Sequence, residues 1–106
     1  MNKVLLIGTV DKEPDVRYVD VGVCVASLTL CTTDRGATLP DGTQLADHNE
    51  WHRVVCWRKL GEVVEQQVHQ GQKLYVEGKL HHRSYVDKSG ATRYVVEIWA
   101  DSLELL

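Results

Sequence analysis

The chain has 106 residues, of which 43% are hydrophobic and 25% are charged, a balance that is typical of a folded domain and excludes a disordered chain. This length predicts one domain over residues 1–106. The net charge is −3, with 12 Lys and Arg against 15 Asp and Glu, so any site for a polyanion has to be a local basic patch. No apolar run is long enough to cross a bilayer, and MNKVLLIGTV lacks the long apolar segment and cleavage site of a signal peptide. We therefore expect a cytoplasmic protein.

The first half of the chain is dominated by strand patterns. NKVLLIGTV (2–10) is a mostly apolar run that ends in the turn signal DKEP, and RYVD (17–20) is compatible with a short edge strand. GVCVASLTLCTT (22–33) alternates, and residues 34–49, with Gly, Pro and Asp-Gly, predict a long hairpin loop. The expected core face of 22–33 carries Cys24, Ala26, Leu28 and Leu30.

The second half adds one helix and three strands. EWHRVVCW (50–57) is a predicted strand, and RKLGEVVEQQVHQG (58–71) changes to helical spacing, with Gly71 suited to the C-terminal cap. Residues 72–86 alternate again, DKSG (87–90) predicts a hairpin turn, and the remaining residues predict a last strand. The apolar positions behind these assignments are Leu60, Val63, Val64 and Val68 in the helix and Leu74, Val76, Gly78 and Leu80 in the following strand.

The order of these elements predicts the fold class. Five main strands with one helix between the third and the fourth is the order of an all-β, five-stranded Greek-key OB-fold barrel. Barrels of this kind often bind oligonucleotides or oligosaccharides.

Aromatic and basic residues interleave on two predicted strands. Trp51, Arg53 and Trp57 share one strand face, but periodicity alone leaves core and binding surface about equally favoured for that face. An arginine between two tryptophans argues against the core, because buried arginine needs a partner. The next strand has a polar and aromatic face opposite its apolar one, which favours a surface that stacks bases and contacts phosphates. That face carries Tyr75, Glu77, Lys79, His81, Arg83 and Tyr85, whereas Trp99, on a face with Val95 and Glu97, is expected to pack or to lie at an interface and not to bind a ligand.

Signals of catalysis or metal binding are weak. His81 and its neighbour His82 point to opposite faces of a strand, and no other ligand pair has zinc-like spacing, so no metal is expected. Cys56 lies near His52, but cysteines are more often buried and inert than nucleophilic. There is no phosphate-binding glycine loop. We expect no enzyme and no cofactor, and we interpret the three cysteines (Cys24, Cys31 and Cys56) as small hydrophobic residues of a reducing compartment.

Several separated motifs then point to one family. With MNKVLLIGTV, DVRY, GVCVASLTLCTT, EWHRVV, KLGEVV, KLYVEGKL and DKSGATRYVVEIWA in this order, the sequence resembles the N-terminal OB-fold domain of bacterial single-stranded DNA-binding proteins over residues 2–105. The resemblance implies binding of single-stranded DNA without strong sequence preference, in replication, recombination and repair. It also implies a homotetramer in the cytoplasm, associated with the nucleoid.

The resemblance also implies site residues, matched position by position. Stacking aromatics fall on Trp51, Trp57 and Tyr85, and basic positions along the DNA path fall on Arg53, Lys59, Arg83, Arg17 and Lys3. His52 matches a histidine that the family uses at a subunit contact.

The sequence departs from the family pattern in three places. The loop after residue 33 has Gly36 and Ala37 where the family usually has an exposed aromatic, and the same loop is acidic on balance. The chain ends at Leu106 without the flexible linker and acidic tip that recruit replication and repair proteins, so we expect such partners only where a longer chain carries that tail. Two alternatives stay open: a tail-less, usually dimeric primosomal-type paralogue, and a protein-interaction OB module that binds DNA weakly.

Overall fold

Six strands and one helix make up the computed structural model, which describes all of residues 1–106. They are, in chain order, β1 (Val4–Val10), β2 (Asp15–Val19), β3 (Val23–Asp34), β4 (His48–Trp57), α1 (Lys59–Gln67), β5 (Lys73–Val86) and β6 (Thr92–Leu105). None of these is a helix with the length and apolar character needed to pass through a membrane.

The sheet closes on itself. Its strands follow the order β1-β5-β6-β4-β3, and β3 returns to β1 through the pairs Thr9↔Cys31 and Val10↔Leu30. The β4–β6 pairing is parallel and the other pairings are antiparallel. The short strand β2 pairs only with β3 and lies outside the ring. The ring therefore has five strands with α1 between its third and fourth members, which confirms the predicted OB-fold barrel.

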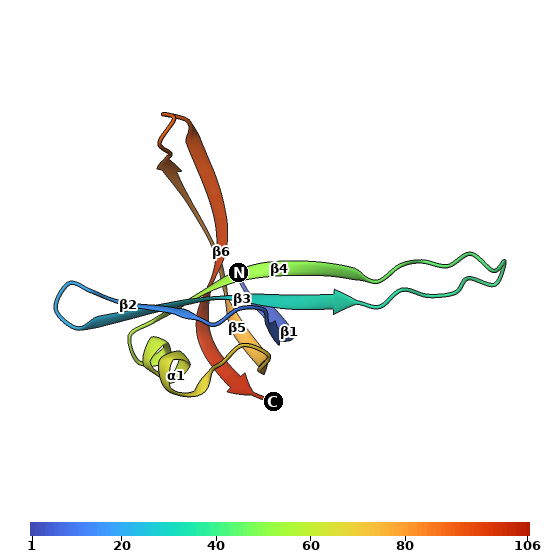
Figure 1. Cartoon of the computed structure of the whole chain (residues 1–106), viewed down its shortest axis with the longest axis horizontal. Helices are drawn as coiled ribbons and strands as arrows, with labels where there is room; N and C mark the ends of the chain where they lie inside the picture. Colours follow the sequence, from blue (N-terminus) through green and yellow to red (C-terminus); the bar gives the residue numbers. More distant parts are fainter.

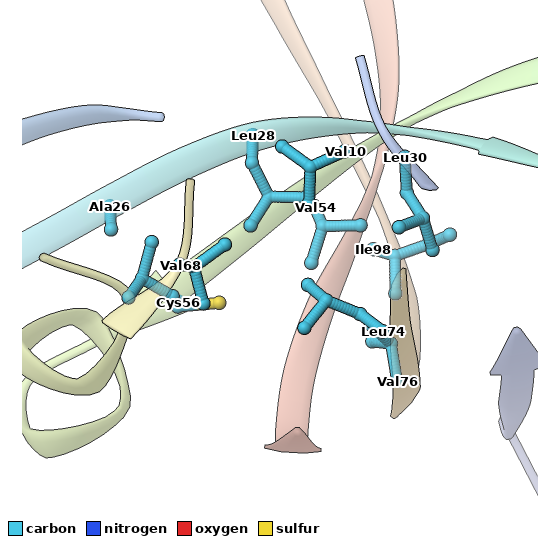
Figure 2. Close-up of a cluster of buried hydrophobic side chains, with 11 residues drawn as sticks. Val10, Ala26, Leu28, Leu30, Val54, Cys56, Val68, Leu74, Val76 and Ile98 are labelled. Carbon is cyan, nitrogen blue, oxygen red and sulfur yellow. The ribbon is translucent and has the colours of Figure 1, made fainter. Parts of the chain in front are cut away.

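Buried residues alternate along β1, β3 and the first half of β5, as the period of two requires, whereas β4 and β6 bury adjacent residues (Val54, Val55 and Cys56; Glu97 and Ile98). On β3 the buried positions are Cys24, Ala26, Leu28 and Leu30, as predicted. Figure 2 shows side chains from several strands meeting in one interior cluster, with Val68, just after the helix, close to Cys56. The cluster consists of Val10, Ala26, Leu28, Leu30, Val54, Cys56, Val64, Val68, Leu74, Val76 and Ile98.

Helix α1 packs over β3 and is shorter than its periodicity predicts. A Cβ at Gly61 would lie 2.9 Å from the carbonyl oxygen of Cys56 and 3.0 Å from Sγ of Cys24, so glycine permits this close approach. The helix ends at Gln67, and Val68 is its C-cap residue with an extended backbone. The prediction that Gly71 caps the helix is wrong. Gly71 instead has φ of +89° and donates its N–H to the carbonyl of Val10, so it belongs to the turn that leads into β5.

Two hairpins extend from the barrel, which explains principal extents of 60 × 38 × 30 Å. The outer half of the β5–β6 hairpin rises out of the barrel, and the β3–β4 hairpin projects at a steep angle to it (Figure 1). The pairing of β5 with β1 stops at Gly78, where a bulge also interrupts the pairing with β6. Beyond this point β5 pairs only with β6. The core position predicted for Leu80 is therefore wrong, and its side chain is 45% exposed.

Candidate nucleic-acid interface

Strand β4 presents its tryptophans to solvent. Trp51 is 58% exposed and Trp57 is 40% exposed, whereas Val54 and Cys56 on the opposite face are fully buried. The choice that periodicity left open is thus decided for the aromatic and basic positions: Trp51, Arg53 and Trp57 face solvent, although Val55 on the same side is buried. The two indoles are six residues apart, or roughly 20 Å along the strand at about 3.3 Å per residue. They can therefore contact different bases of one extended strand.

The outer half of β5 adds a second aromatic and a second cation. Tyr85 is 47% exposed, and Cζ of Arg83 lies 6.0 Å from the centroid of its ring, at the outer limit of a cation–π contact. The side chain of Arg83 is 42% exposed. An open hollow on this surface is lined by Arg53, Arg83, Tyr85 and Val95. The structure therefore brings together basic residues that are thirty positions apart in sequence.

Glu97 of β6 links the two arginines. Its Oε2 accepts from Nε of Arg53 and its Oε1 from Nε of Arg83, each at 3.2 Å. Burial works to raise the pKa of this carboxyl, but hydrogen bonds from Trp99 and from both arginines outweigh it, so the pKa lies below the ordinary value. Glu97 is therefore ionised at neutral pH. The sequence reasoning did not recognise this residue, although the predicted register of the last strand placed it on the face of Trp99.

Trp99 packs against the side chains of the site, which confirms the prediction of a packing role. Its ring lies edge-on to Trp57, with 5.6 Å between centroids, and stacks on His81 at 3.7 Å. Its Nε1 donates to Oε1 of Glu97 at 3.1 Å. These contacts fix the indole from several sides, so Trp99 buttresses Trp57.

The other predicted basic residues differ in how close they lie to this group. Arg17 lines a hollow together with Arg53, although its guanidinium pairs with Asp15 at 3.1 Å. Lys59 is exposed at the first position of α1, two residues after Trp57. Lys3 pairs with a different carboxylate from the two arginines: its ammonium lies 3.1 Å from Glu77 of β5.

His52 lies on the other face of β4, away from the tryptophans. Its Nε2 is 2.8 Å from Oγ1 of Thr32 on the neighbouring strand, and its side chain is half-buried. Cys56, which follows on the same face, has a pKa that burial raises to about 12. A thiol that stays protonated is a poor nucleophile, so the pair has the opposite of an activating environment. No group of three or more His, Cys, Asp or Glu side chains gathers in a geometry that could hold a metal ion.

The chain also matches the model of a known protein family. The model of the single-strand binding protein family matches residues 1–106, which is the whole chain. The chain belongs to the single-strand binding protein family.

Two relatives support the same assignment. The chain is 52% identical over 106 residues to a single-stranded DNA-binding protein of Bacteroides thetaiotaomicron. The match covers 100% of this chain and 66% of that relative. A solved structure of the Plasmodium falciparum SSB in complex with ssDNA superposes with a TM-score of 0.90 at 27% identity, covering 100% of this chain and 95% of that one.

The loop between β3 and β4 carries no aromatic side chain. Gly36 and Ala37 lie in a hairpin extension in which the N–H of Leu45 donates to the carbonyl of Ala37 at 2.7 Å. The acidic residues of the loop shape its turns. Asp47 accepts from the N–H of Gly36 at 2.8 Å, and Asp41 accepts from the N–H of Thr43 at 2.9 Å. Hydrogen bonds from Thr43 lower the pKa of Asp41, so its carboxylate stays charged and adds to the negative potential of the loop.

Proposed function

We propose that this chain binds and protects single-stranded DNA without sequence preference during replication, recombination and repair. The observation that carries the proposal is the outer surface formed by β4, β5 and β6. Two exposed tryptophans on this surface flank Arg53, which shares Glu97 with a second arginine, Arg83, and Arg83 lies beside the exposed Tyr85. An aromatic ring can stack on any base, and a cation can neutralise any phosphate. A surface built from such groups therefore does not select a base sequence.

Each site residue has a proposed role in this mechanism. Bases stack on exposed aromatic rings, and guanidinium and ammonium groups neutralise the phosphates between them. The proposed stacking residues are Trp51, Trp57 and Tyr85, and the proposed phosphate contacts are Arg53, Lys59 and Arg83, with Arg17 and Lys3 further along the path. The mechanism is reversible sequestration and needs no chemical step, cofactor or metal. Because the proposed ligand is single-stranded DNA of the chromosome, we propose a cytoplasmic, nucleoid-associated location.

We also propose that the protein assembles into a homotetramer. Residues 4–8 of β1 pair with β5 on one side, whereas β3 reaches β1 only at Thr9 and Val10. This leaves a free strand edge next to Leu5 and Ile7, which are each 57% exposed. An unpaired edge with apolar side chains is suited to pairing with a second copy of the chain. His52, on the face opposite the DNA-contacting tryptophans, is the proposed subunit contact outside that edge.

A titration with oligo-dT tests the DNA proposal. Tryptophan fluorescence should be quenched by single strands at low salt, the affinity should fall as salt rises, and a duplex of equal length should compete poorly. Absence of quenching in a folded sample would contradict the proposal. That result would favour the alternative of a protein-interaction module, which the net charge of −3 supports.

Light scattering at micromolar concentration tests the assembly. A tetramer is expected, and a monomer would contradict it. A dimer would favour the primosomal-type alternative over the tetrameric single-strand binder.

A further inference from the structure

Glu97 is the only charged side chain buried in the structure, at 4% exposure. It lies directly beneath the surface that we propose for a polyanion, where a negative charge opposes binding. Burying a carboxylate is costly unless it is paired and hydrogen-bonded. Its role therefore needs an explanation beyond the charge that it carries.

Its partners satisfy the carboxylate from three neighbouring strands. Oε2 accepts from Arg53 of β4, and Oε1 accepts from Arg83 of β5 and from Nε1 of Trp99 on β6 itself. The residues of the two arginine contacts are 44 and 14 positions apart in sequence. The carboxylate is thus the point where the three strands of the proposed interface meet.

The geometry of these bonds leaves part of each guanidinium available to a phosphate. Both bind Glu97 through Nε, and a guanidinium has five N–H donors in a planar fork. The Nη donors of each fork remain for other partners, on side chains that are 50% and 42% exposed. Anchoring Nε restricts the rotation of a side chain that is otherwise highly flexible, so less freedom is lost when a phosphate binds.

We propose that Glu97 is a positioning residue for single-stranded DNA: it holds Arg53, Arg83 and Trp99 in the arrangement that receives the strand, and this outweighs the repulsion from its charge. The inference rests on the proposed function and deepens it. A simple counter-charge has the opposite consequence, because its removal strengthens binding. The sign of the effect therefore separates the two roles.

Glu97→Gln tests the proposal, because it removes the charge with almost no change of shape. The amide can accept through one atom only and turns its N–H₂ toward an arginine. We expect oligo-dT affinity to fall by roughly tenfold and the dependence of log K on log salt to become shallower by about one phosphate contact. Asp101→Asn is the matched control, because Asp101 is exposed on the same strand and forms no ion pair. This control removes one negative charge, as Glu97→Gln does, and should leave binding unchanged or slightly tighter.

Affinity of Glu97→Gln equal to or above that of the unaltered chain, with a similar melting temperature, would overturn the proposal. Arg83→Lys covers the case in which Glu97→Gln does not fold. Lysine keeps the charge, but its single ammonium cannot bind Glu97 through one donor site and present a fork to phosphate. Arg83→Lys should weaken binding several-fold, and unchanged binding contradicts the positioning role. No binding by the unaltered chain removes the proposed function as well, whereas binding by that chain combined with tighter binding by Glu97→Gln removes only this inference.

Discussion

The imidazole of His81 stacks on the indole of Trp99, with 3.7 Å between the ring centroids and 24° between the ring planes. On another side Trp99 receives Trp57 edge-on at 5.6 Å. Trp57 of β4 therefore packs against an aromatic support built from β5 and β6. Of these three side chains, Trp57 is the most exposed.

Trp57→Ala should weaken binding of oligo-dT by about 1–3 kcal/mol, the usual loss for one stacked base. The melting temperature should change little, because the side chain is 40% exposed. Val54→Ala is the contrasting variant, since Val54 is fully buried. That variant should lose about 2 kcal/mol of stability and keep its affinity at temperatures where it is folded. A Trp57→Ala variant that loses mainly stability would place Trp57 in the core.

The same arrangement assigns the fluorescence signal. Trp99→Phe should retain most of the quenching by single strands, because Trp99 is half-buried and two other rings, Trp57 and His81, pack against it. Trp57→Phe and Trp51→Phe replace exposed rings and should each remove part of it. Equal quenching in all three variants would contradict this assignment. The measurement is the quenching amplitude at saturating oligo-dT for each folded variant.

Alternation along the strands was sufficient to predict the barrel, because a period of two follows from the backbone and a half-buried sheet repeats it in apolar residues. It could not predict where a strand leaves the barrel. Leu80 has the phase of Val76 but lies beyond Gly78, the last residue of β5 that pairs with β1. The position of that boundary depends on Val4, more than seventy residues away in sequence.

The site was predictable in part for a similar reason. An arginine between Trp51 and Trp57 indicates an outward face within one strand. The link from Arg53 to Glu97 depends on the parallel β4–β6 pairing, which no local pattern encodes. The exposure of the predicted aromatics agrees with the expectation, and their roles in DNA binding stay predictions.

Gly61→Ala should destabilise the protein although alanine is the better helix former. The gain in helix propensity is at most about 1 kcal/mol, whereas the new Cβ would lie 2.9 Å from a backbone oxygen that cannot move freely. Overpacking of this kind costs typically 1–3 kcal/mol, so we expect a net loss on the order of 1 kcal/mol in urea unfolding. Gln66→Ala, at an exposed position of α1, is the control and should be neutral or slightly stabilising. A Gly61→Ala variant as stable as this control would contradict the close packing of α1 on β3.

Asp87 should make the stability of the β5–β6 turn depend on pH. Hydrogen bonding by Ser89 and the contact with Arg93 hold the pKa of this carboxyl at about 2. Because the folded pKa lies below the unfolded value of about 3.9, the stabilisation is present above that value and is lost as pH falls toward the folded pKa. Asp87→Asn, which imitates the protonated form, should be less stable than the unaltered chain near neutral pH, and the difference should shrink below about pH 4. Chemical unfolding across this range measures it, and a difference that is independent of pH would contradict the prediction.

Restoring an aromatic to the β3–β4 loop should strengthen DNA binding. Ala37 is exposed, and only its backbone carbonyl is engaged, by the N–H of Leu45. Ala37→Trp should therefore leave the loop intact and add one stacking surface, with a gain of about 1 kcal/mol or more in oligo-dT affinity. Gly36→Trp is the matched control, because even a Cβ at Gly36 would lie 1.8 Å from the carbonyl oxygen of Leu45. This second variant should distort the loop and gain less. If Ala37→Trp binds no tighter at low salt, the acidic loop does not approach the strand, and the DNA path is confined to the surface around Trp57 and Arg83.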